Sequence, residues 1–154
     1  MTRPHNEMQM PAPTVLALDL EGTLISNAMS QIPRPGLFEF LSRCRALFPR
    51  VVMFTTVREA KFREVAQLLV DEKFAPAWFA QIEYVNWEGE TKDLGFIPNA
   101  SAEDAVLVDD FERYVHPGQE SRWLQIEYFE HPYLASDTGL EKMLRTLEAL
   151  AAPA

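Results

Sequence analysis

The sequence predicts a three-layer α/β fold built on a parallel, doubly wound, Rossmann-like sheet. Three short, continuous apolar runs, Val15–Leu18, Val51–Phe54 and Ala105–Val108, have the pattern of strands that are covered on both faces. The segments that follow these runs carry apolar residues at helical spacing. Alternation of strands and helices favours a parallel sheet, because the crossover connections keep one hand.

The first predicted strand, Val15–Leu18, ends in Asp19 and is interrupted soon afterwards by Gly22. A helical pattern begins at Pro35, because proline is tolerated in the first turn of a helix. The apolar stripe of this helix consists of Leu37, Phe40, Leu41, Cys44, Leu47 and Phe48. We expect the helix to end near Pro49.

The second predicted strand, Val51–Phe54, stops at Thr55 and Thr56, and another amphipathic helix follows. The apolar residues of that helix are Phe62, Val65, Ala66, Leu69 and Val70. Gln81–Trp87 has the weaker alternation of a further strand, and a polar loop through Lys92 comes next.

The third strongly apolar strand, Ala105–Val108, also ends in acid, at Asp109 and Asp110. Trp123–Tyr128 is a candidate for one more strand. The closing helix is predicted from an apolar stripe of Leu140, Met143, Leu144, Leu147 and Leu150.

Length and composition predict one folded domain. A chain of 154 residues, 47% of them apolar, can bury one sizeable core, and its length argues against a second full domain. The polar, proline-containing segment 1–13 is expected to be a flexible leader, and residues 151–154 a frayed tail. The domain is therefore expected to span residues 14–150.

The charge and the single cysteine narrow the class of protein. A formal net charge of -9 disfavours non-specific binding to nucleic acid or to anionic membranes. No apolar run has the length of a membrane span or the pattern of a secretion signal. Cys44 is the only cysteine, so no internal disulfide can form, and we expect a cytoplasmic protein. The sequence leaves the oligomeric state open.

Acidic residues follow two of the predicted strands, and they are the first candidates for a site. Ligands of open parallel sheets bind outside the carboxyl ends of the strands, where Asp19, Glu21 and Asp109 are expected to face one cavity. Such carboxylates repel one another unless a cation compensates, and Mg²⁺ prefers oxygen ligands. In the alternative interpretation, these acids only meet solvent, Thr55 only caps a helix and Lys92 is a surface charge.

Four segments resemble, in family order, the four motifs of the haloacid-dehalogenase-like phosphatases. They are Leu18–Leu24, Phe54-Thr55, Lys92-Asp93-Leu94 and Val108-Asp109-Asp110. The resemblance is closest to the branch of carboxy-terminal-domain phosphatases and NLI-interacting-factor-like proteins. Further counterparts in that branch are Arg34-Pro35-Gly36 to Phe40-Leu41, Met53–Thr56 and Tyr114–Pro117.

The resemblance implies a magnesium-dependent phosphatase without a separate cap domain. Asp19 would attack phosphorus and form an aspartyl-phosphate, and Glu21 would act as general acid and base. The implied magnesium ligands are Asp19, the backbone carbonyl of Glu21 and Asp109, supported by Asp110, and the implied phosphate-binding residues are Thr55 and Lys92. The substrate would be a phosphoprotein, because related uncapped enzymes often act on large substrates, or a phosphorylated small molecule. The branch resemblance points to phosphoserine, but a shared fold and shared motifs do not transfer substrate identity.

The sequence departs from the family at Glu21, where an aspartate is expected. The extra methylene displaces the carboxyl group, and a misplacement of about 1 Å can cost roughly 10²-fold in rate. A competent enzyme, a slow enzyme that accumulates phospho-enzyme, and a phosphate- or phosphopeptide-binding interaction module therefore all stay open. The last would gain weight if the aromatic residues of the second half formed a surface patch rather than core.

Two other kinds of residue are predicted to be structural. Cys44 lies on the apolar stripe of a helix and is expected to be a core thiol rather than a nucleophile. The three histidines are widely separated and lack zinc-ligand spacing.

Overall fold

The computed structural model describes residues 11–152 and shows one parallel sheet flanked by helices. Residues 1–10 and 153–154, which hold most of the predicted leader and half of the predicted tail, lie outside the described residues. No helix in the described part of the chain is both long enough and apolar enough to cross a membrane.

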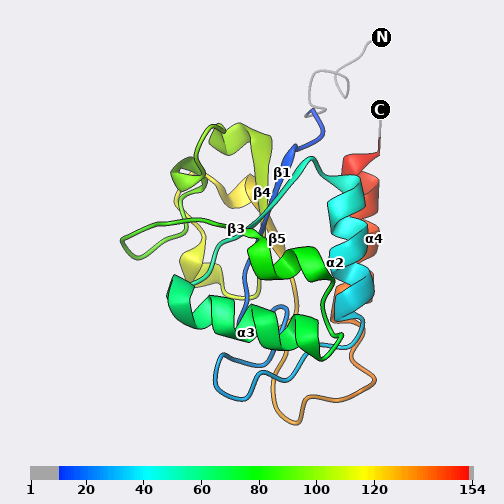
Figure 1. Ribbon diagram of the computed structural model, residues 1–154. Coiled ribbons are helices and arrows are strands. Elements are labelled where there is room, and N and C mark those ends of the chain that lie inside the picture. The colour runs from blue at the N-terminus through cyan, green and yellow to red at the C-terminus, as the bar shows by residue number, and fades with distance from the viewer. Residues whose placement is uncertain (1–10, 153–154) are drawn as a thin grey trace.

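The sheet has five strands in the order β3-β2-β1-β4-β5, and all neighbouring pairs are parallel (Figure 1). Its strands are β1 (Val15–Leu18), β2 (Arg50–Met53), β3 (Glu83–Tyr84), β4 (Ala105–Asp109) and β5 (Trp123–Gln125). The winding runs outward from β1 through β2 to β3 and then reverses to β4 and β5. The predicted doubly wound sheet is therefore confirmed, and its switch point lies between β1 and β4.

Three α-helices lie in the positions that the apolar stripes predicted. They are α2 (Leu37–Leu47), α3 (Glu59–Asp71) and α4 (Gly139–Ala151). Pro35 precedes α2 instead of starting it, and α2 ends before Pro49 because the backbone at Phe48 is already extended, with a φ of -122°.

Two predicted strands are shorter than expected. The segment Gln81–Trp87 contains only β3, and Gln81 itself belongs to a short 3₁₀ helix, η1 (Ala77–Gln81). The segment Trp123–Tyr128 contains only β5. Beyond it the chain leaves the sheet, because the Phe129 N–H donates to the carbonyl of Gly22 at 2.9 Å.

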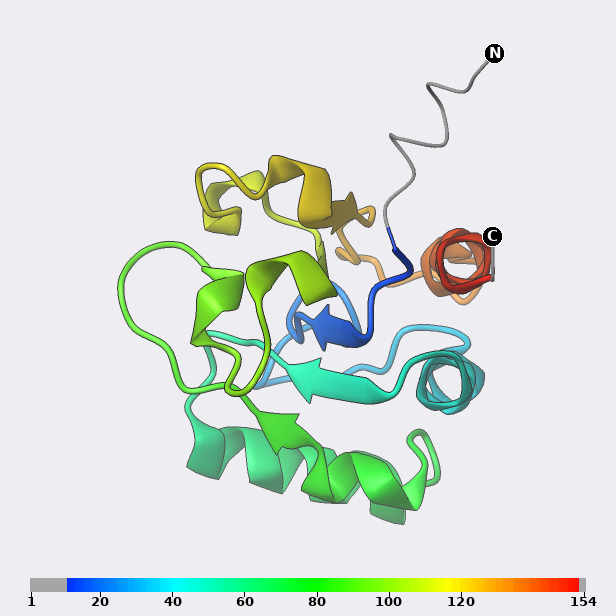
Figure 2. The ribbon, with the colours of Figure 1, turned by 90° about the horizontal axis from the view of Figure 1, so that it is seen from above.

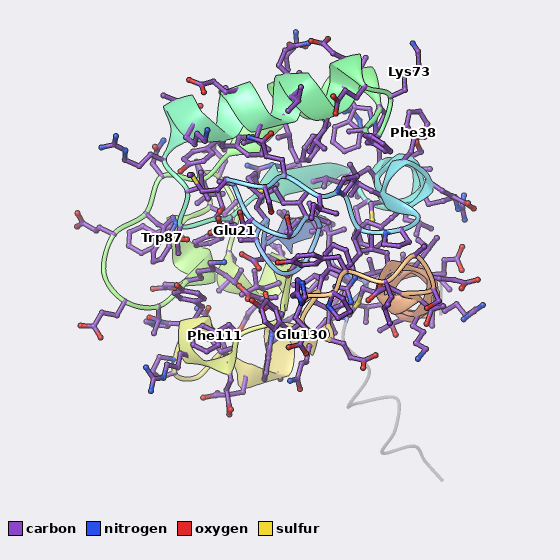
Figure 3. All side chains as sticks on the ribbon, turned by 90° about the horizontal axis from the view of Figure 1, so that it is seen from below. Glu21, Phe38, Lys73, Trp87, Phe111 and Glu130 are labelled. Carbon is purple, nitrogen blue, oxygen red and sulfur yellow. The ribbon has the colours of Figure 1, made fainter. Side chains whose placement is uncertain are left out.

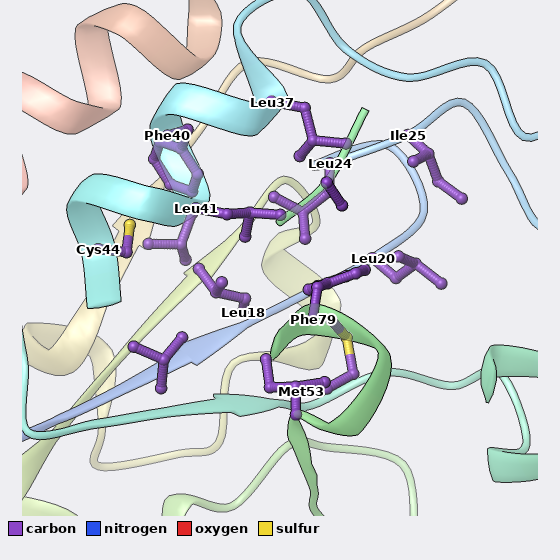
Figure 4. Close-up of a cluster of buried hydrophobic side chains, with 14 of the residues drawn as sticks. Leu18, Leu20, Leu24, Ile25, Leu37, Phe40, Leu41, Cys44, Met53 and Phe79 are labelled. Carbon is purple, nitrogen blue, oxygen red and sulfur yellow. The ribbon is translucent and has the colours of Figure 1, made fainter. Parts of the chain in front are cut away.

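The two faces of the sheet are covered differently. Leu16 and Leu18 of β1 pack in one apolar cluster with residues of all three α-helices (Figures 2 and 4). Val15 and Ala17 point to the opposite face, where they pack with Leu94 and other residues of the segment 85–105. That second layer is made of loops and of 3₁₀ turns, η2 (Leu94–Phe96) and η3 (Ala102–Asp104).

Loops gather at the carboxyl edge of the sheet. The loop after β1 and the loop that leads into α4 run side by side at the lower edge of Figure 1, joined by the Phe129 to Gly22 hydrogen bond. The loop after β1 packs against helix α2 and the sheet in a buried apolar cluster that includes Leu20, Leu24 and Phe40 (Figure 4).

Candidate active site

Three carboxylates meet at the switch point of the sheet. Asp19 follows β1, Asp109 is the last residue of β4, and Asp110 comes next. Their nearest ligand atoms all lie within 4.8 Å of one another. The Asp19 N–H donates to the carbonyl of Val108 at 3.0 Å, so the pairing of β1 with β4 sets the two carboxylates side by side. Asp109 is fully buried and Asp19 is 6% exposed.

Lys92 places a buried ammonium group between two of these acids. Its Nζ lies 2.8 Å from Asp19 Oδ1 and 2.6 Å from Asp109 Oδ2, and the side chain is fully buried. The Lys92 N–H donates to the carbonyl of Tyr114 at 2.7 Å, and Nζ lies 4.9 Å from the centre of the Tyr114 ring. The alternative that Lys92 is a surface charge is therefore wrong.

Burial and mutual repulsion change the acidity of the cluster. Burial, together with the contact with Asp19, raises the pKa of Asp110 to about 7. Burial also raises the pKa of Asp109 to about 6, with Asp19 acting in the same direction and Lys92 against it. Burial lowers the pKa of Lys92, but attraction to Asp19 and Asp109 outweighs burial and the net pKa is raised. Lys92 is therefore an ammonium ion, and the cluster has an affinity for further positive charge.

Thr23 belongs to the cluster, although no role was predicted for it from the sequence. Its buried hydroxyl lies 2.8 Å from Asp19 Oδ2 and 3.1 Å from Asp110 Oδ1. Thr23 donates to Oδ2 of Asp19 and Lys92 donates to Oδ1, so the two contacts fix the orientation of the Asp19 carboxylate. The position of Thr23 four residues after Asp19, within the first motif, is the signal that identifies it.

The side chain of Glu21 lies near the cluster without joining it. The sequence predicted that Asp19, Glu21 and Asp109 would converge, but in the structure Asp110 is the third carboxylate beside the other two. The chain turns after β1, with the Leu24 N–H donating to the Leu20 carbonyl at 2.9 Å, so the strand geometry does not continue to Glu21. Glu21 Oε2 instead accepts a hydrogen bond of 2.7 Å from the Ala28 N–H.

Thr55 is buried at the end of the neighbouring strand. Its Oγ1 accepts a hydrogen bond of 3.1 Å from the Val57 N–H, and its carbonyl accepts one of 2.8 Å from Trp87 Nε1. Helix α3 begins only at Glu59 and has no side-chain cap, so the alternative that Thr55 caps this helix is wrong. Thr56, the next residue, faces the cavity beside Asp19.

A cavity of about 400 Å³ opens over the cluster at the carboxyl edge. Its lining residues are Asp19, Glu21, Thr56, Asp110, Phe111, Tyr114 and Tyr128. Figure 3 looks onto this edge and shows Glu21 near its middle, with Trp87 and Phe111 to one side. Tyr128 is one of the aromatic residues of the second half that were expected to be core unless they formed a surface patch, and Phe111 was assigned no role from the sequence. Nothing in the spacing of either residue marks it as exposed.

Comparison with protein families identifies the family of the chain, and comparison with solved structures identifies its fold. The model of the family described as NLI interacting factor-like phosphatase matches residues 14–154. Among solved structures, that of the fission yeast RNA polymerase II CTD phosphatase Fcp1, a variant bound to beryllium fluoride, is similar with a TM-score of 0.53. The match has 14% sequence identity and covers 90% of this chain and 50% of that chain, so it shows a shared fold over half the length of Fcp1. No curated protein matches the chain.

Proposed function

Because the chain belongs to the family of NLI interacting factor-like phosphatases, we propose that it is a Mg²⁺-dependent phosphomonoester hydrolase that acts through an aspartyl-phosphate on Asp19. The observation that carries the proposal is the contact of Asp19 with both Lys92 and Thr23, within a buried acidic cluster that borders the cavity. The substrate would be a phosphorylated small molecule or a phosphoprotein. The family resemblance that the sequence predicted is confirmed by the match.

The donor set fits Mg²⁺. The three carboxylates of Asp19, Asp109 and Asp110 offer oxygen atoms within 4.8 Å of one another, and oxygen is the ligand that Mg²⁺ prefers. Burial first, and then repulsion by the neighbouring carboxylates, raises the pKa values of Asp109 and Asp110, so a bound cation would stabilise their deprotonated forms. Asp19 and Asp109, with Asp110 in support and the backbone carbonyl of Glu21, would hold the ion. When bound, Mg²⁺ would neutralise charge on the phosphoryl oxygens.

Asp19 is proposed as the nucleophile because its position is fixed and it lies at the floor of the cavity. One of its carboxylate oxygens forms a bond to phosphorus while the bond from phosphorus to the leaving oxygen breaks. Lys92 lies within reach of the phosphoryl group and offsets the charge that builds up there. Water then attacks the aspartyl-phosphate and releases inorganic phosphate, which restores Asp19.

Glu21 is proposed as the general acid that protonates the leaving oxygen and as the base that accepts the proton of the attacking water. It lines the cavity together with Asp19. The hydrogen bond from Ala28 occupies one carboxylate oxygen, Oε2, and so fixes the side chain at the rim. Thr55 and Thr56 would complete the binding of the phosphoryl group from the end of β2.

One observation favours a second candidate function, that of a phosphopeptide-binding module without turnover. Glu21 is not among the clustered carboxylates, and an acid held by the Ala28 N–H is less free to transfer protons. Such a module would bind a phosphorylated partner at Asp19 and Lys92 and release no phosphate.

Phosphate release from an aryl phosphate, with and without Mg²⁺, tests the proposal. If the chain is the proposed enzyme, we expect magnesium-dependent release of phosphate, and we expect Asp19→Asn to abolish it. Asp71→Asn, on the exposed side of α3, is the matched control and should keep full activity. Binding of a phosphopeptide without turnover by the unchanged chain would instead support the binding module.

A further inference from the structure

Large aromatic side chains stand exposed around the mouth of the cavity. Phe111 is 44% exposed and Tyr128 is 56% exposed, and both line the cavity whose floor includes Asp19. Tyr114 lines the cavity as well and is partly buried. Exposing large aromatic surface to water is unfavourable, so several exposed aromatic residues around one cavity indicate a binding surface.

One wall of the mouth is a chain of aromatic contacts. Phe111 packs edge-on against Tyr114 with ring centres 5.2 Å apart, and Tyr114 packs edge-on against Trp87 at 6.5 Å. Trp87 is fixed in turn by its hydrogen bond to the carbonyl of Thr55 and by its contact with Phe54, at 5.6 Å. This wall is therefore held in place before any ligand binds.

The other wall, Tyr128, is held by the turn that follows the nucleophile. A Cβ atom at Gly22 would lie 2.8 Å from two carbons of the Tyr128 ring, so the ring packs directly on the glycine backbone. The neighbouring residue Phe129 donates its N–H to the Gly22 carbonyl. Gly22 also has a φ of +78°, a conformation that favours glycine. The turn thus fixes Tyr128 and the cluster around Asp19 relative to each other.

We propose that Phe111, Tyr114 and Tyr128 form an aromatic slot that selects phosphate esters of phenols, and that the natural substrate class is the phosphotyrosyl side chain. The inference rests on the proposed function, because it concerns the group attached to the transferred phosphorus. Because Asp19 and these three aromatic residues line one cavity, a group attached to phosphorus at Asp19 would extend along the aromatic side chains. A phenyl ring fills that space with edge or face contacts, whereas a seryl methylene leaves it empty.

The position of Glu21 favours the same class. A phenol has a pKa of about 10, so a phenolate leaves more readily than the alkoxide of serine and needs less help from an acid. In the first step the Asp19–phosphorus bond forms, the electron pair of the breaking bond goes to the phenolic oxygen, and Glu21 supplies the proton. A glutamate fixed at the rim by Ala28 suits a leaving group that depends only weakly on that proton.

The test compares two peptides that differ only at the phosphorylated residue, tyrosine or serine, with uncharged flanking residues. We expect kcat/KM to be about tenfold higher for the phosphotyrosyl peptide, from ring contacts of the usual strength. Phe111→Ala or Tyr128→Ala should lower this preference about threefold or more, and Phe111→Tyr should retain it. Phe38→Ala, at an equally exposed phenylalanine (49%) of α2 on another side of the molecule in Figure 3, is the matched control and should leave both rates unchanged.

The outcomes separate this inference from the proposed function. Equal or faster hydrolysis of the phosphoseryl peptide would overturn the aromatic slot and leave the phosphatase intact. Hydrolysis of neither peptide, nor of an aryl phosphate, would overturn the phosphatase. In that case, the affinities of the Asp19→Asn variant for the two peptides test the aromatic slot. Tighter binding of the phosphotyrosyl peptide, weakened by Phe111→Ala, would support the slot. Equal binding of the two peptides would overturn it.

Discussion

In the proposed mechanism, the carboxylate of Glu21 is the group on which turnover depends most, apart from the nucleophile. It lines the cavity beside Asp19, yet it is held by the Ala28 N–H and lies outside the cluster of Asp19, Asp109 and Asp110. Glutamine at this position keeps the hydrogen bond to Ala28 but cannot transfer a proton. Glu21→Gln therefore isolates the acid–base role from the structural one.

We expect Glu21→Gln to lower kcat about 10²-fold or more, in the usual range for loss of a general acid or base. With an aryl phosphate, whose leaving group needs little protonation, the variant should accumulate phospho-enzyme because the attacking water loses its base. Rapid-quench measurement of the initial burst, compared with steady-state release, checks this. An unchanged kcat would show that Glu21 has no acid–base role and that another group acts as the general acid and base.

At the scale of residues, strand ends and motif order identified the acids and the lysine of the site, but not Thr23 of the first motif or the residues whose position depends on a turn. Asp19, Lys92, Asp109 and Asp110 were selected from strand ends and motif order, and the structure brings them together. Their catalytic roles stay predictions. Tyr128 was expected to be core by default, and its exposure could not be predicted, since its contact with Gly22 depends on the path of the loop that leads into α4.

Among the elements, α4 is tied to the loop of the first motif by one buried arginine. Arg34 is 1% exposed, and its Nε lies 2.8 Å from Asp137 Oδ1. Its NH1 donates to the Thr23 carbonyl at 3.2 Å. Asp137 also accepts the N–H of Gly139, the first residue of α4, at 2.9 Å. The start of α4 and the turn beside Asp19 therefore share one ionic contact.

Because the Arg34 side chain packs against Gly139, we expect Gly139→Ala to destabilise the protein, although alanine usually stabilises helices relative to glycine. A Cβ at Gly139 would lie only 2.1 Å from the Arg34 side chain. We expect the substitution to lower the free energy of unfolding by about 1–3 kcal/mol, the usual cost of overpacking, measured by urea denaturation.

Arg34→Met provides the control, because it removes the group with which the new methyl collides. In that background Gly139→Ala should be close to neutral, and the non-additivity of the two substitutions measures the clash. A Gly139→Ala protein more stable than the unchanged chain would contradict this view of the contact.

The elements themselves follow the apolar pattern closely in the centre of the fold and less well at its edges. The strands β1, β2 and β4 each contain a continuous, buried apolar run, which makes them recognisable in the sequence. The edge strands β3 and β5 are two and three residues long, too short for a clear alternation. Their extent depends on pairing with a neighbour rather than on local sequence.

At the scale of the whole molecule, the parallel, doubly wound sheet was predicted, and the composition of the second layer was not. All three α-helices pack in the cluster on one face, and the described residues cover the other face with loops and 3₁₀ turns. Such turns are short and carry no apolar period that a sequence pattern could reveal. The family resemblance predicted from the motifs is confirmed over residues 14–154.

The charge of the site predicts how the stability of the whole domain depends on pH and on Mg²⁺. Asp109 and Asp110 have folded pKa values of about 6 and about 7, above the ordinary value of 3.8. Without metal, the folded state thus binds more protons than the unfolded state across this range. The stability these groups contribute is present at low pH and is lost as pH rises through the folded pKa values.

Mg²⁺ should reverse this loss, because it binds the deprotonated carboxylates. We expect Mg²⁺ to raise Tm more at pH 8 than at pH 6, where it must displace protons. Thermal unfolding at both pH values, with and without Mg²⁺, measures the difference. Asp109→Asn should reduce the Mg²⁺ effect, whereas Asp71→Asn should not, and an equal Mg²⁺ effect at both pH values would contradict the assignment.

The central claim is that Asp19 carries the phosphoryl group during turnover, and rapid acid quenching with radiolabelled aryl phosphate tests it most directly. The chain is mixed with labelled substrate and Mg²⁺, quenched within milliseconds, digested and mapped. We predict a hydroxylamine-sensitive label on the peptide that contains Asp19, absent from Asp19→Asn. Turnover without any covalent label, or a label on another residue, would contradict the account.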